Sequence, residues 1–213
     1  MKVNNYKILV IGDSCEDKFV YGDCSRLCPE APVPVFNPIK ETTNPGMAGN
    51  VAKNIEALGF TVDLVTNSNK ITKTRIVDSS SNQMLVRIDE NDYCDRIGPN
   101  VLSNIPFSQY KAVVISDYNK GFLTNVDIRE ISRCHHTVFM DTKKLLGPYC
   151  RDIDYIKIND VEYNRTLETI QSVSYDVNEK LIVTKGKNGA TYKGVNYPTT
   201  PSSVQVDRDW ETD

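Results

Sequence analysis

The sequence has no long apolar segment and no targeting signal at its amino terminus. None of its apolar runs approaches the roughly 20 residues that a membrane-spanning helix requires. The amino terminus, Met1-Lys2-Val3-Asn4-Asn5-Tyr6-Lys7, lacks the basic and then apolar layout of a secretory signal peptide. We therefore expect a cytoplasmic protein with no membrane partner.

An excess of charge of either sign is also missing. Lysine and arginine total 25 against 28 aspartate and glutamate residues, which gives a formal net charge of -3. This balance argues against nucleic acid as the main partner. The chain has 213 residues, of which 39% are hydrophobic. That is enough for one large domain or two small ones, and it excludes wholesale disorder.

Patterns typical of zinc sites and disulfide frameworks are weak or missing. The two histidines, His135 and His136, are neighbours and would point in different directions on a helix or a strand. Six cysteines are scattered along the chain, and the close pair Cys24 and Cys28 has no second pair to complete a zinc site. Without a secretory signal, a disulfide framework is not expected. Reduced thiols are the expectation, and a zinc site is the weaker alternative.

What the sequence does contain is a series of apolar, β-branched runs, several of which end in a polar residue. Such runs are typical of strands buried in a parallel sheet. Helical spacing follows the glycine-rich residues 44–50 and continues to about residue 58, and it returns at residues 125–132. Strands that alternate with helices predict a mainly parallel α/β fold. The expected strands are residues 7–13, 61–66, 111–117, 137–141, 155–159 and 180–184.

Two further regions depart from this pattern. Residues 19–39 combine short apolar alternation with Pro29, Pro32, Pro34 and Pro38, which predicts a protruding β segment rather than core. Residues 72–77 and 83–89 have the composition of two strands joined by a serine-rich turn. Together these regions predict a small sheet that stands off the main domain.

Polar side chains follow the expected strands at Asp13, Asp117, Asp141, Asn159 and Thr184. Ligands of open α/β sheets bind at the carboxyl ends of the strands, so these residues suggest a shared cleft. The alternative for each Asp or Asn is a helix N-cap. The glycine-rich residues 44–50 offer free backbone amides to an anion or a hydroxyl-rich ligand, and a plain tight turn explains them equally well.

Several local motifs are more specific. They are Val10-Ile11-Gly12-Asp13, Pro29-Glu30-Ala31-Pro32-Val33-Pro34-Val35, Pro45-Gly46-Met47-Ala48-Gly49-Asn50, Lys73-Thr74-Arg75, Leu85-Val86-Arg87-Ile88-Asp89, Ser116-Asp117-Tyr118-Asn119-Lys120-Gly121, Asp141-Thr142-Lys143, Asn159-Asp160-Val161-Glu162 and Val183-Thr184-Lys185-Gly186. In this order, over residues 7–192, the set resembles the ribokinase-like (PfkB) carbohydrate kinases. The most similar branch is the heptose-7-phosphate kinase domain of the bifunctional kinase/adenylyltransferase. Each motif alone is weak, and the ordered set is the specific signal.

The resemblance implies a single ribokinase-like domain over residues 1–213, incomplete at its carboxyl terminus and missing some crossover units. The implied reaction is transfer of the γ-phosphate of ATP to a sugar hydroxyl, with Mg²⁺ as cofactor. D-glycero-D-manno-heptose 7-phosphate is the expected acceptor. Residues 15–39 and 72–89 match the family's β lid, which covers the sugar, excludes water and commonly forms the dimer contact. A homodimer is therefore expected.

The resemblance also implies roles for individual residues. The sugar phosphate would be bound by Asp13, Asp17, Gly46, Asn50, Arg87, Asp117 and Lys120. Among these, the cations Arg87 and Lys120 suit an anionic group, and the alternative for each is a solvated surface charge. Glu162 would order Mg²⁺ through water. The residues implied for ATP and its metal are Asp141, Asn159, Glu162, Thr184, Gly186 and Gly189.

Some parts of the family pattern are missing. The Gly-Ala-Gly-Asp motif, whose amides form an anion hole and whose Asp is the base, does not occur, although Asp213 falls at the base position. Met47 and Thr142 replace a usual glycine and proline, and residues 67–71 are too few for the helix and strand that relatives carry there. Two alternatives therefore stand: an inactive remnant that binds a sugar phosphate or dimerises, and an unrelated α/β binding or transferase domain.

Overall fold

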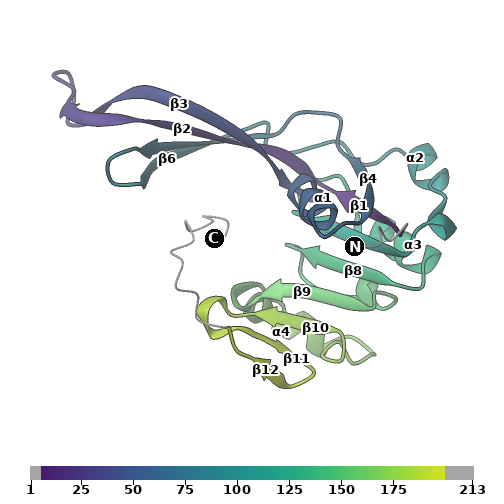
Figure 1. Cartoon of the computed structure of the whole chain (residues 1–213). Helices are drawn as coiled ribbons and strands as arrows, with labels where there is room; N and C mark the ends of the chain where they lie inside the picture. The colour runs from purple at the N-terminus through teal and green to yellow at the C-terminus, as the bar shows by residue number, and fades with distance from the viewer. Residues whose placement is uncertain (1–5, 200–213) are drawn as a thin grey trace.

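The computed structural model describes residues 6–199 as two sheets with helices packed on the larger one (Figure 1). The strands are β1 Lys7–Gly12, β2 Ser14–Leu27, β3 Pro34–Met47, β4 Thr61–Thr66, β5 Thr72–Asp78, β6 Gln83–Glu90, β7 Ala112–Asp117, β8 Val138–Thr142, β9 Tyr155–Asn159, β10 Leu181–Thr184, β11 Ala190–Tyr192 and β12 Val195–Tyr197. The α-helices are α1 Ala48–Ala57, α2 Pro99–Ser103, α3 Asn125–Cys134 and α4 Asp160–Gln171, and short 3₁₀ helices occupy Phe107–Gln109, Pro148–Cys150 and Gly186–Asn188.

The larger sheet has eight strands in the order β12-β11-β10-β9-β8-β7-β1-β4. From β4 to β10 every neighbouring pair is parallel, and only β11 and β12 are antiparallel. The mainly parallel α/β fold predicted from the sequence is therefore confirmed. Strand β1, between β7 and the edge strand β4, is apolar on both faces because helices cover both sides of a parallel sheet, and Leu9, Val10 and Ile11 are fully buried.

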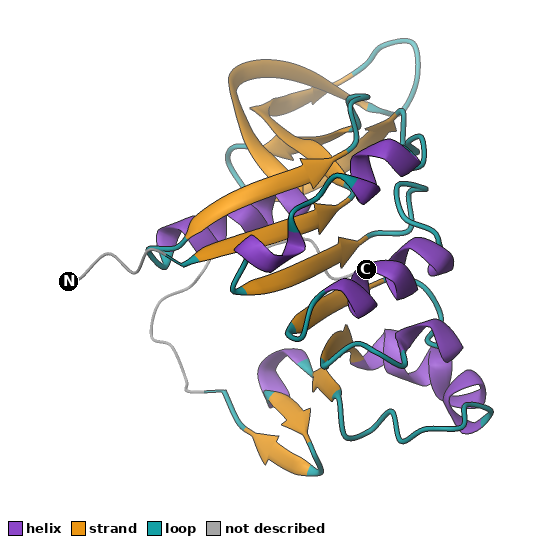
Figure 2. Ribbon diagram, turned by 90° about the vertical axis from the view of Figure 1, so that its right-hand side faces the viewer, coloured by secondary structure: helices purple, strands orange, loops and turns teal. Residues whose placement is uncertain are grey.

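Helices pack on both faces of this sheet (Figure 2). On one face, Ile128 and Ile131 of α3 join the main apolar cluster, and α4 packs against it with Tyr163 and Ile170. On the other face, α1 places Ala48 and Ala52 against Val10. Each large side chain buried in this way stabilises the fold by about 1.5–3 kcal/mol. None of the helices within residues 6–199 is long and apolar enough to cross a bilayer.

The smaller sheet, called the arm here, consists of four strands in the order β3-β2-β5-β6. The long hairpin of β2 and β3 extends away from the main sheet (Figure 1). Pro34, Pro38 and Pro45 all lie on β3, an edge strand, where a missing amide costs least. The predicted protruding β segment is thus present as a paired hairpin, with register shifts between Tyr21 and Gly22 and between Asp23 and Arg26.

Strand β3 is longer than the sequence predicts. Residues 44–47 were expected to form a glycine-rich loop, but they continue β3 because they pair with residues 14–17 of β2. Helix α1 begins directly after them at Ala48. The tight turn is therefore reduced to the junction between Met47 and Ala48.

The connection between β4 and β5 is short because the two strands belong to different sheets. Only residues 67–71 separate them, and β5 pairs in parallel with β2 of the arm. Asn67 secures the passage: its side chain accepts from Ser14 N at 2.7 Å and donates to Ser14 O at 3.1 Å. The start of the arm is thus fastened to both β1 and β4.

Candidate functional site

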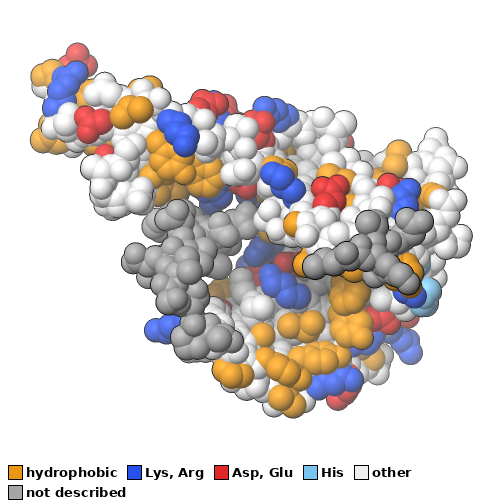
Figure 3. Space-filling model, viewed as in Figure 1, with side chains coloured by type: hydrophobic (Ala, Val, Ile, Leu, Met, Phe, Trp, Pro, Cys, Tyr) orange, Lys and Arg blue, Asp and Glu red, His pale blue; other side chains and the backbone are white. Residues whose placement is uncertain are grey.

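The polar strand ends lie along one edge of the main sheet, close to the arm. Strands β1, β7, β8, β9 and β10 are parallel, so the polar residues at or after their carboxyl ends share that edge. The space-filling view shows the molecule hollowed between the arm and the main sheet, with charged side chains of both signs in the hollow (Figure 3). The topology therefore brings Asp13, Asp117, Asp141, Asn159 and Thr184 to one edge.

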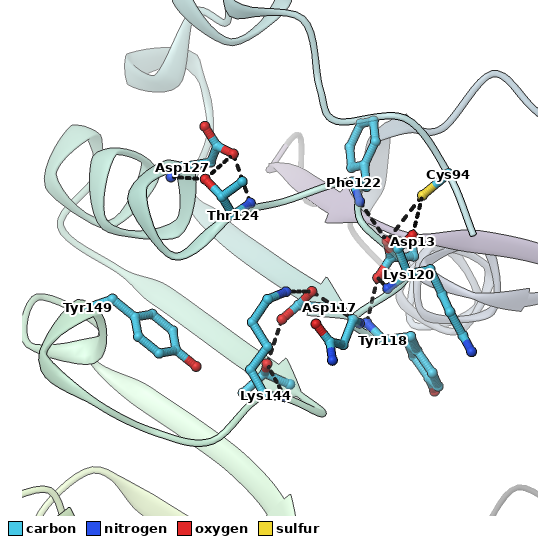
Figure 4. A network of polar contacts seen from close by, with 12 residues as sticks. Asp13, Cys94, Asp117, Tyr118, Lys120, Phe122, Thr124, Asp127, Lys144 and Tyr149 are labelled. Carbon is cyan, nitrogen blue, oxygen red and sulfur yellow. Dashed lines mark hydrogen bonds and ion pairs between the residues drawn. The ribbon is translucent and has the colours of Figure 1, made fainter. Parts of the chain in front are cut away.

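Asp13 is fully buried and holds the loop that follows β7 (Figure 4). Its carboxylate accepts from the backbone amides of Tyr118 at 2.6 Å, Phe122 at 3.2 Å and Lys120 at 3.4 Å. The thiol of Cys94 also donates to it at 3.4 Å. Burial, and then the charge of Asp13, raises the pKa of Cys94 to about 12, which disfavours the thiolate form. Through these contacts Asp13 positions the loop of residues 118–122.

Asp117 is buried at the end of β7 and pairs with Thr142, the last residue of β8, and with Lys144, which follows that strand. Thr142 donates its hydroxyl to the carboxylate at 2.6 Å. The Lys144 ammonium forms an ion pair with the same carboxylate (Figure 4). Burial raises the pKa of Asp117 above its ordinary value, although Lys144 acts in the opposite direction. Sequence reasoning did not identify Lys144; its only signal was its place three residues beyond the strand expected at residues 137–141.

Asp17 and Arg75 form a buried ion pair inside the arm. The Arg75 Nη1 to Asp17 Oδ1 distance is 2.5 Å, and both residues are more than nine-tenths buried. The guanidinium also lies 5.1 Å from the centre of the Phe19 ring. Gly46 is required beside this pair, because a Cβ there would stand 2.2 Å from Asp17 Oδ2. Arg75 was not among the predicted site residues, although it belongs to the motif Lys73-Thr74-Arg75.

The amino terminus of α1 lies beside the end of β1, close to Asp13, and no side chain caps it. Its N-cap residue, Met47, has φ 55° and ψ -128°, a backbone conformation that glycine adopts easily and other residues rarely do. Ala48 N donates to the backbone oxygen of Asp13 at 2.9 Å, which joins the helix to the end of β1. Asn50, predicted to bind sugar hydroxyls, is half-buried in the first turn.

Two hydroxyl groups beside this junction are buried without a hydrogen-bond partner within residues 6–199. They belong to Ser14, at the start of β2, and Ser116, next to the end of β7. Ser116 also explains why residue 12 is glycine, because a Cβ on Gly12 would stand 1.8 Å from the Ser116 backbone oxygen. An unpartnered buried hydroxyl is uncommon in a native structure and is satisfied when water or a ligand supplies the missing bond.

Arg87 and Lys120, the cations predicted for an anionic group, each already pair with a carboxylate. Arg87 binds Asp89 through two hydrogen bonds of 2.8 Å, and Lys120 pairs with Asp92. The bonds to Asp89 raise the pKa of Arg87 and lower that of Asp89. Both cations would have to exchange partners to bind a phosphate, and their predicted roles stay predictions.

Asn159 and Glu162 form the capping box of α4. Glu162 N donates to Asn159 Oδ1 at 2.7 Å, and Asn159 N donates to Glu162 Oε2 at 2.8 Å. The Glu162 Oε1 atom pairs with the Lys143 ammonium. On the paired strands β8 and β9, Lys157 forms an ion pair with Asp141 at 2.8 Å. The N-cap alternative considered from the sequence is therefore correct for Asn159.

The predicted nucleotide residues at the end of β10 lie in a tight turn. Gly186 has φ 53° and faces open space, whereas Gly189 has φ 86° and lies against the backbone of β12. A Cβ on Gly189 would stand 2.0 Å from Tyr197 O, so this glycine is needed by the turn itself. Thr184 donates to Ile158 O at 3.4 Å and leads into the turn.

Within residues 6–199 no group of three metal-ligating side chains lies close together. Magnesium is usually held by one or two carboxylates, several waters and the phosphates of the nucleotide, rather than by a protein cage. Glu162 at the sheet edge fits that mode once its Oε1 atom is free. Asp213, the predicted base, lies outside the described residues.

A second hollow, of about 470 Å³, is lined by Ser108, Arg133, Cys134, His135 and His136. It lies beside the end of α3 and the start of β8, at the edge opposite the polar strand ends. The His135 ring is already engaged, since its nitrogens lie 3.0 Å from Tyr110 O and from Thr137 N. This hollow is separate from the candidate site.

Comparison with known proteins gives a consistent set of relatives. No family model matches the chain. The "Bifunctional protein HldE" of Vibrio atlanticus (strain LGP32) is 30% identical over 249 residues, which cover 92% of this chain and 51% of the relative. That of Caulobacter sp. (strain K31) is 38% identical over 153 residues, covering 57% of this chain and 31% of the relative. The chain thus spans about half, or less, of these relatives. The first alignment exceeds the 213 residues of this chain, so the relative has residues within the span that are missing here.

Solved structures share the fold at low sequence identity. The phosphofructokinase-2 of Escherichia coli in complex with potassium has a TM-score of 0.62 at 13% identity, covering 94% of this chain and 79% of that one. The ribokinase of Arabidopsis thaliana complexed with ribose and ATP has a TM-score of 0.58 at 13% identity, covering 94% of this chain and 80% of that one.

Proposed function

Since the chain belongs to the ribokinase-like carbohydrate kinase family, we propose that its site binds ATP and a sugar phosphate and transfers a phosphoryl group to a sugar hydroxyl. The observation that carries this proposal is the line of polar strand ends at one sheet edge, close to a β arm that bears the buried pair Asp17 and Arg75. The acceptor we propose first is D-glycero-D-manno-heptose 7-phosphate, because the relatives are HldE proteins.

In this proposal, different residues of the site bind the sugar, its phosphate and the metal. Arg75 holds the Asp17 carboxylate in place to accept hydrogen bonds from sugar hydroxyls, and Asp13 holds the loop of residues 118–122 beside it. Lys120 turns from Asp92 to the phosphate of the sugar. Magnesium, when bound, supplies charge neutralisation at the nucleotide phosphates. Glu162 would hold its water shell from the start of α4.

A test combines calorimetry with an ADP-release assay over a panel of sugar phosphates, in the presence of magnesium and ATP. We expect saturable binding, tightest for heptose 7-phosphate, and ADP release with that sugar. Asn50→Ala should weaken sugar binding about tenfold, the loss of one or two hydrogen bonds. Asn54→Ala is the matched control, because Asn54 is exposed on the next turn of the same helix. Absence of binding to every sugar phosphate would contradict the proposal.

A second candidate function, binding without turnover, is favoured by one specific observation. The sequence has no Gly-Ala-Gly-Asp motif, and residues 208–212 contain no glycine ahead of Asp213. In the same assay this candidate gives saturable sugar-phosphate binding and no ADP release. ADP release abolished by Asp213→Asn would instead identify Asp213 as the base.

The arm also supports a proposed homodimer. Val86 and Ile88 of β6 are about half-exposed. Strand pairing places them on the same face of the arm as Ile76 and Val20. That face is opposite the one that carries Arg75. An exposed apolar face of this kind suits a second copy of the chain.

A further inference from the structure

The ammonium group of Lys143 lies between two parts of the proposed site. On one side it forms an ion pair with Glu162 at the start of α4, and on the other it lies 5.6 Å from the centre of the Tyr118 ring. Tyr118 begins the loop that Asp13 holds. Lys143 therefore connects the proposed sugar side of the site with the proposed nucleotide side.

The two oxygens of Glu162 have separate tasks. Oε2 accepts from Asn159 N at 2.8 Å and completes the cap of α4. Oε1 accepts only from Lys143 among the hydrogen bonds and ion pairs found within residues 6–199. Release of Lys143 would thus free Oε1 and leave the cap in place.

The backbone of Lys143 is anchored by a hydrogen bond, whereas its ammonium group is at the end of a long side chain that can change position. Its backbone amide donates to Asp117 O at 2.9 Å, which anchors the residue at the end of β8. Its side chain is 34% exposed, whereas that of Glu162 is 9% exposed. A long, flexible and partly exposed lysine can exchange one anionic partner for another, while the carboxylate it covers cannot leave.

The ion pair therefore competes with metal binding. Within residues 6–199 Glu162 belongs to no group of three or more His, Cys, Asp or Glu side chains that could hold a metal ion. A single carboxylate whose charge is already neutralised by a lysine is a poor ligand for magnesium, which is bound by carboxylate together with phosphates.

We propose that Lys143 is an exchangeable partner that couples metal and nucleotide binding. Without nucleotide it pairs with Glu162 Oε1. When nucleotide phosphates are present, its ammonium moves to a phosphate oxygen and leaves Oε1 open to the water shell of the metal. The inference rests on the proposed function, and it makes the coupling reciprocal, so metal also favours nucleotide binding.

Binding of Mn²⁺, followed by the electron paramagnetic resonance of the free ion, tests this. Without nucleotide, Lys143→Met should bind Mn²⁺ at least about fivefold more tightly than the original chain, at the lower end of typical coupling. With saturating ADP the two proteins should differ less. Lys143→Arg keeps the charge and should behave as the original. Lys193→Met, which removes an equal charge from the exposed pair with Glu179, is the matched control.

The double variant Lys143→Met with Glu162→Gln should lose the gain, because the amide still caps α4 but binds metal poorly. Lys143→Gln gives a second neutral variant, and far-ultraviolet circular dichroism confirms that each protein is folded. Equal Mn²⁺ affinity of Lys143→Met, Lys143→Gln and the original chain without nucleotide would overturn the exchange. If the original chain binds no ADP, the proposed function fails and the coupling with it, while the metal-only comparison still decides whether Lys143 masks Glu162.

Discussion

At the residue scale, the arm contains a buried ion pair between Asp17 and Arg75. Neither side chain is exposed by more than a tenth, so each charge depends on the other. Removing one partner of a buried ion pair leaves an uncompensated charge in a poorly solvated place, which costs far more than losing an exposed pair.

We expect Asp17→Asn to lower the free energy of unfolding by about 3–5 kcal/mol. Replacing both partners, Asp17→Asn with Arg75→Leu, should recover much of that loss, because no buried charge remains. Urea unfolding of the three proteins measures this. Glu179→Gln, which breaks the exposed pair with Lys193, is the control and should change stability by about 1 kcal/mol or less. An Asp17→Asn protein as stable as the control would contradict the interpretation.

Met47 replaces the glycine of the family pattern, but its backbone keeps the conformation that favours glycine. The resemblance predicts glycine here, and the observed φ of 55° is one that favours glycine. The Met47 side chain is buried, at 2% exposure, so packing offsets part of the backbone strain. The sequence identified the departure, but only the dihedral angles show that the turn persists.

At the scale of elements, the two longer helices that follow β7 and β9 begin with capping boxes. Thr124 and Asp127 form that of α3, and Asn159 and Glu162 form that of α4. Each box satisfies two backbone amides that would otherwise be unpaired. Asp127 is also bound by Arg96 through bonds of 2.6 and 2.9 Å, which ties α3 to the segment after β6.

The α3 capping box predicts a pH dependence. Burial raises the pKa of Asp127, but the hydrogen bonds from Arg96 and Thr124 outweigh it, and the net pKa is below its ordinary value. Stability from such an acid is present above its unfolded-state pKa and is lost as the pH falls through the folded-state pKa. Asp127→Asn should therefore cost about 1 kcal/mol at neutral pH and progressively less in acid.

Thermal unfolding of the Asp127→Asn protein and of the original chain, measured between about pH 2 and pH 7, tests this expectation. The range brackets the usual carboxylate pKa of about 4. Glu130→Gln makes the same chemical change at an exposed position of α3 and should leave the pH profile unchanged. A difference between Asp127→Asn and the original chain that grows toward low pH would show that the sign is wrong.

At the scale of the whole molecule, the chain passes between the arm and the main sheet with its helices four times: from β1 to β2, from β3 to α1, from β4 to β5 and from β6 to α2. Gly12 and Asp13 lie at the first of these crossings and Asn67 at the third, beside the proposed sugar site. Movement of the arm relative to the main sheet would therefore change the site directly, which suits a cover that excludes water.

The proposed dimer makes a prediction at this scale. Ile88→Lys should shift the protein from dimer to monomer, because it places a charge on the apolar face of the arm. Sedimentation velocity measures the shift. Leu64→Lys is the control, since Leu64 is an exposed apolar residue on β4 of the other sheet and should leave the assembly unchanged. A monomeric original chain, or dimers equally stable in both variants, would contradict the proposed interface.

The sequence by itself determined the class of sheet, the six parallel strands of the main sheet and the presence of a separate arm, because these depend on local apolar periodicity and on where proline and glycine occur. It did not predict the antiparallel strands β11 and β12. It also determined that polar residues follow the strands, since parallel strands bring their carboxyl ends to one edge. The length of β3 was not predictable, because it depends on pairing with β2 rather than on its own composition.

Only the tertiary structure decided which charges meet. Arg75 and Asp17 are 58 residues apart, Lys144 and Asp117 27 apart, and Lys143 and Glu162 19 apart. None of these pairs follows from spacing along one helix or one strand. Each depends on how two separately formed elements are placed against each other, so the roles of Arg75, Lys143 and Lys144 became identifiable only after the strand order and the packing of α4 were known.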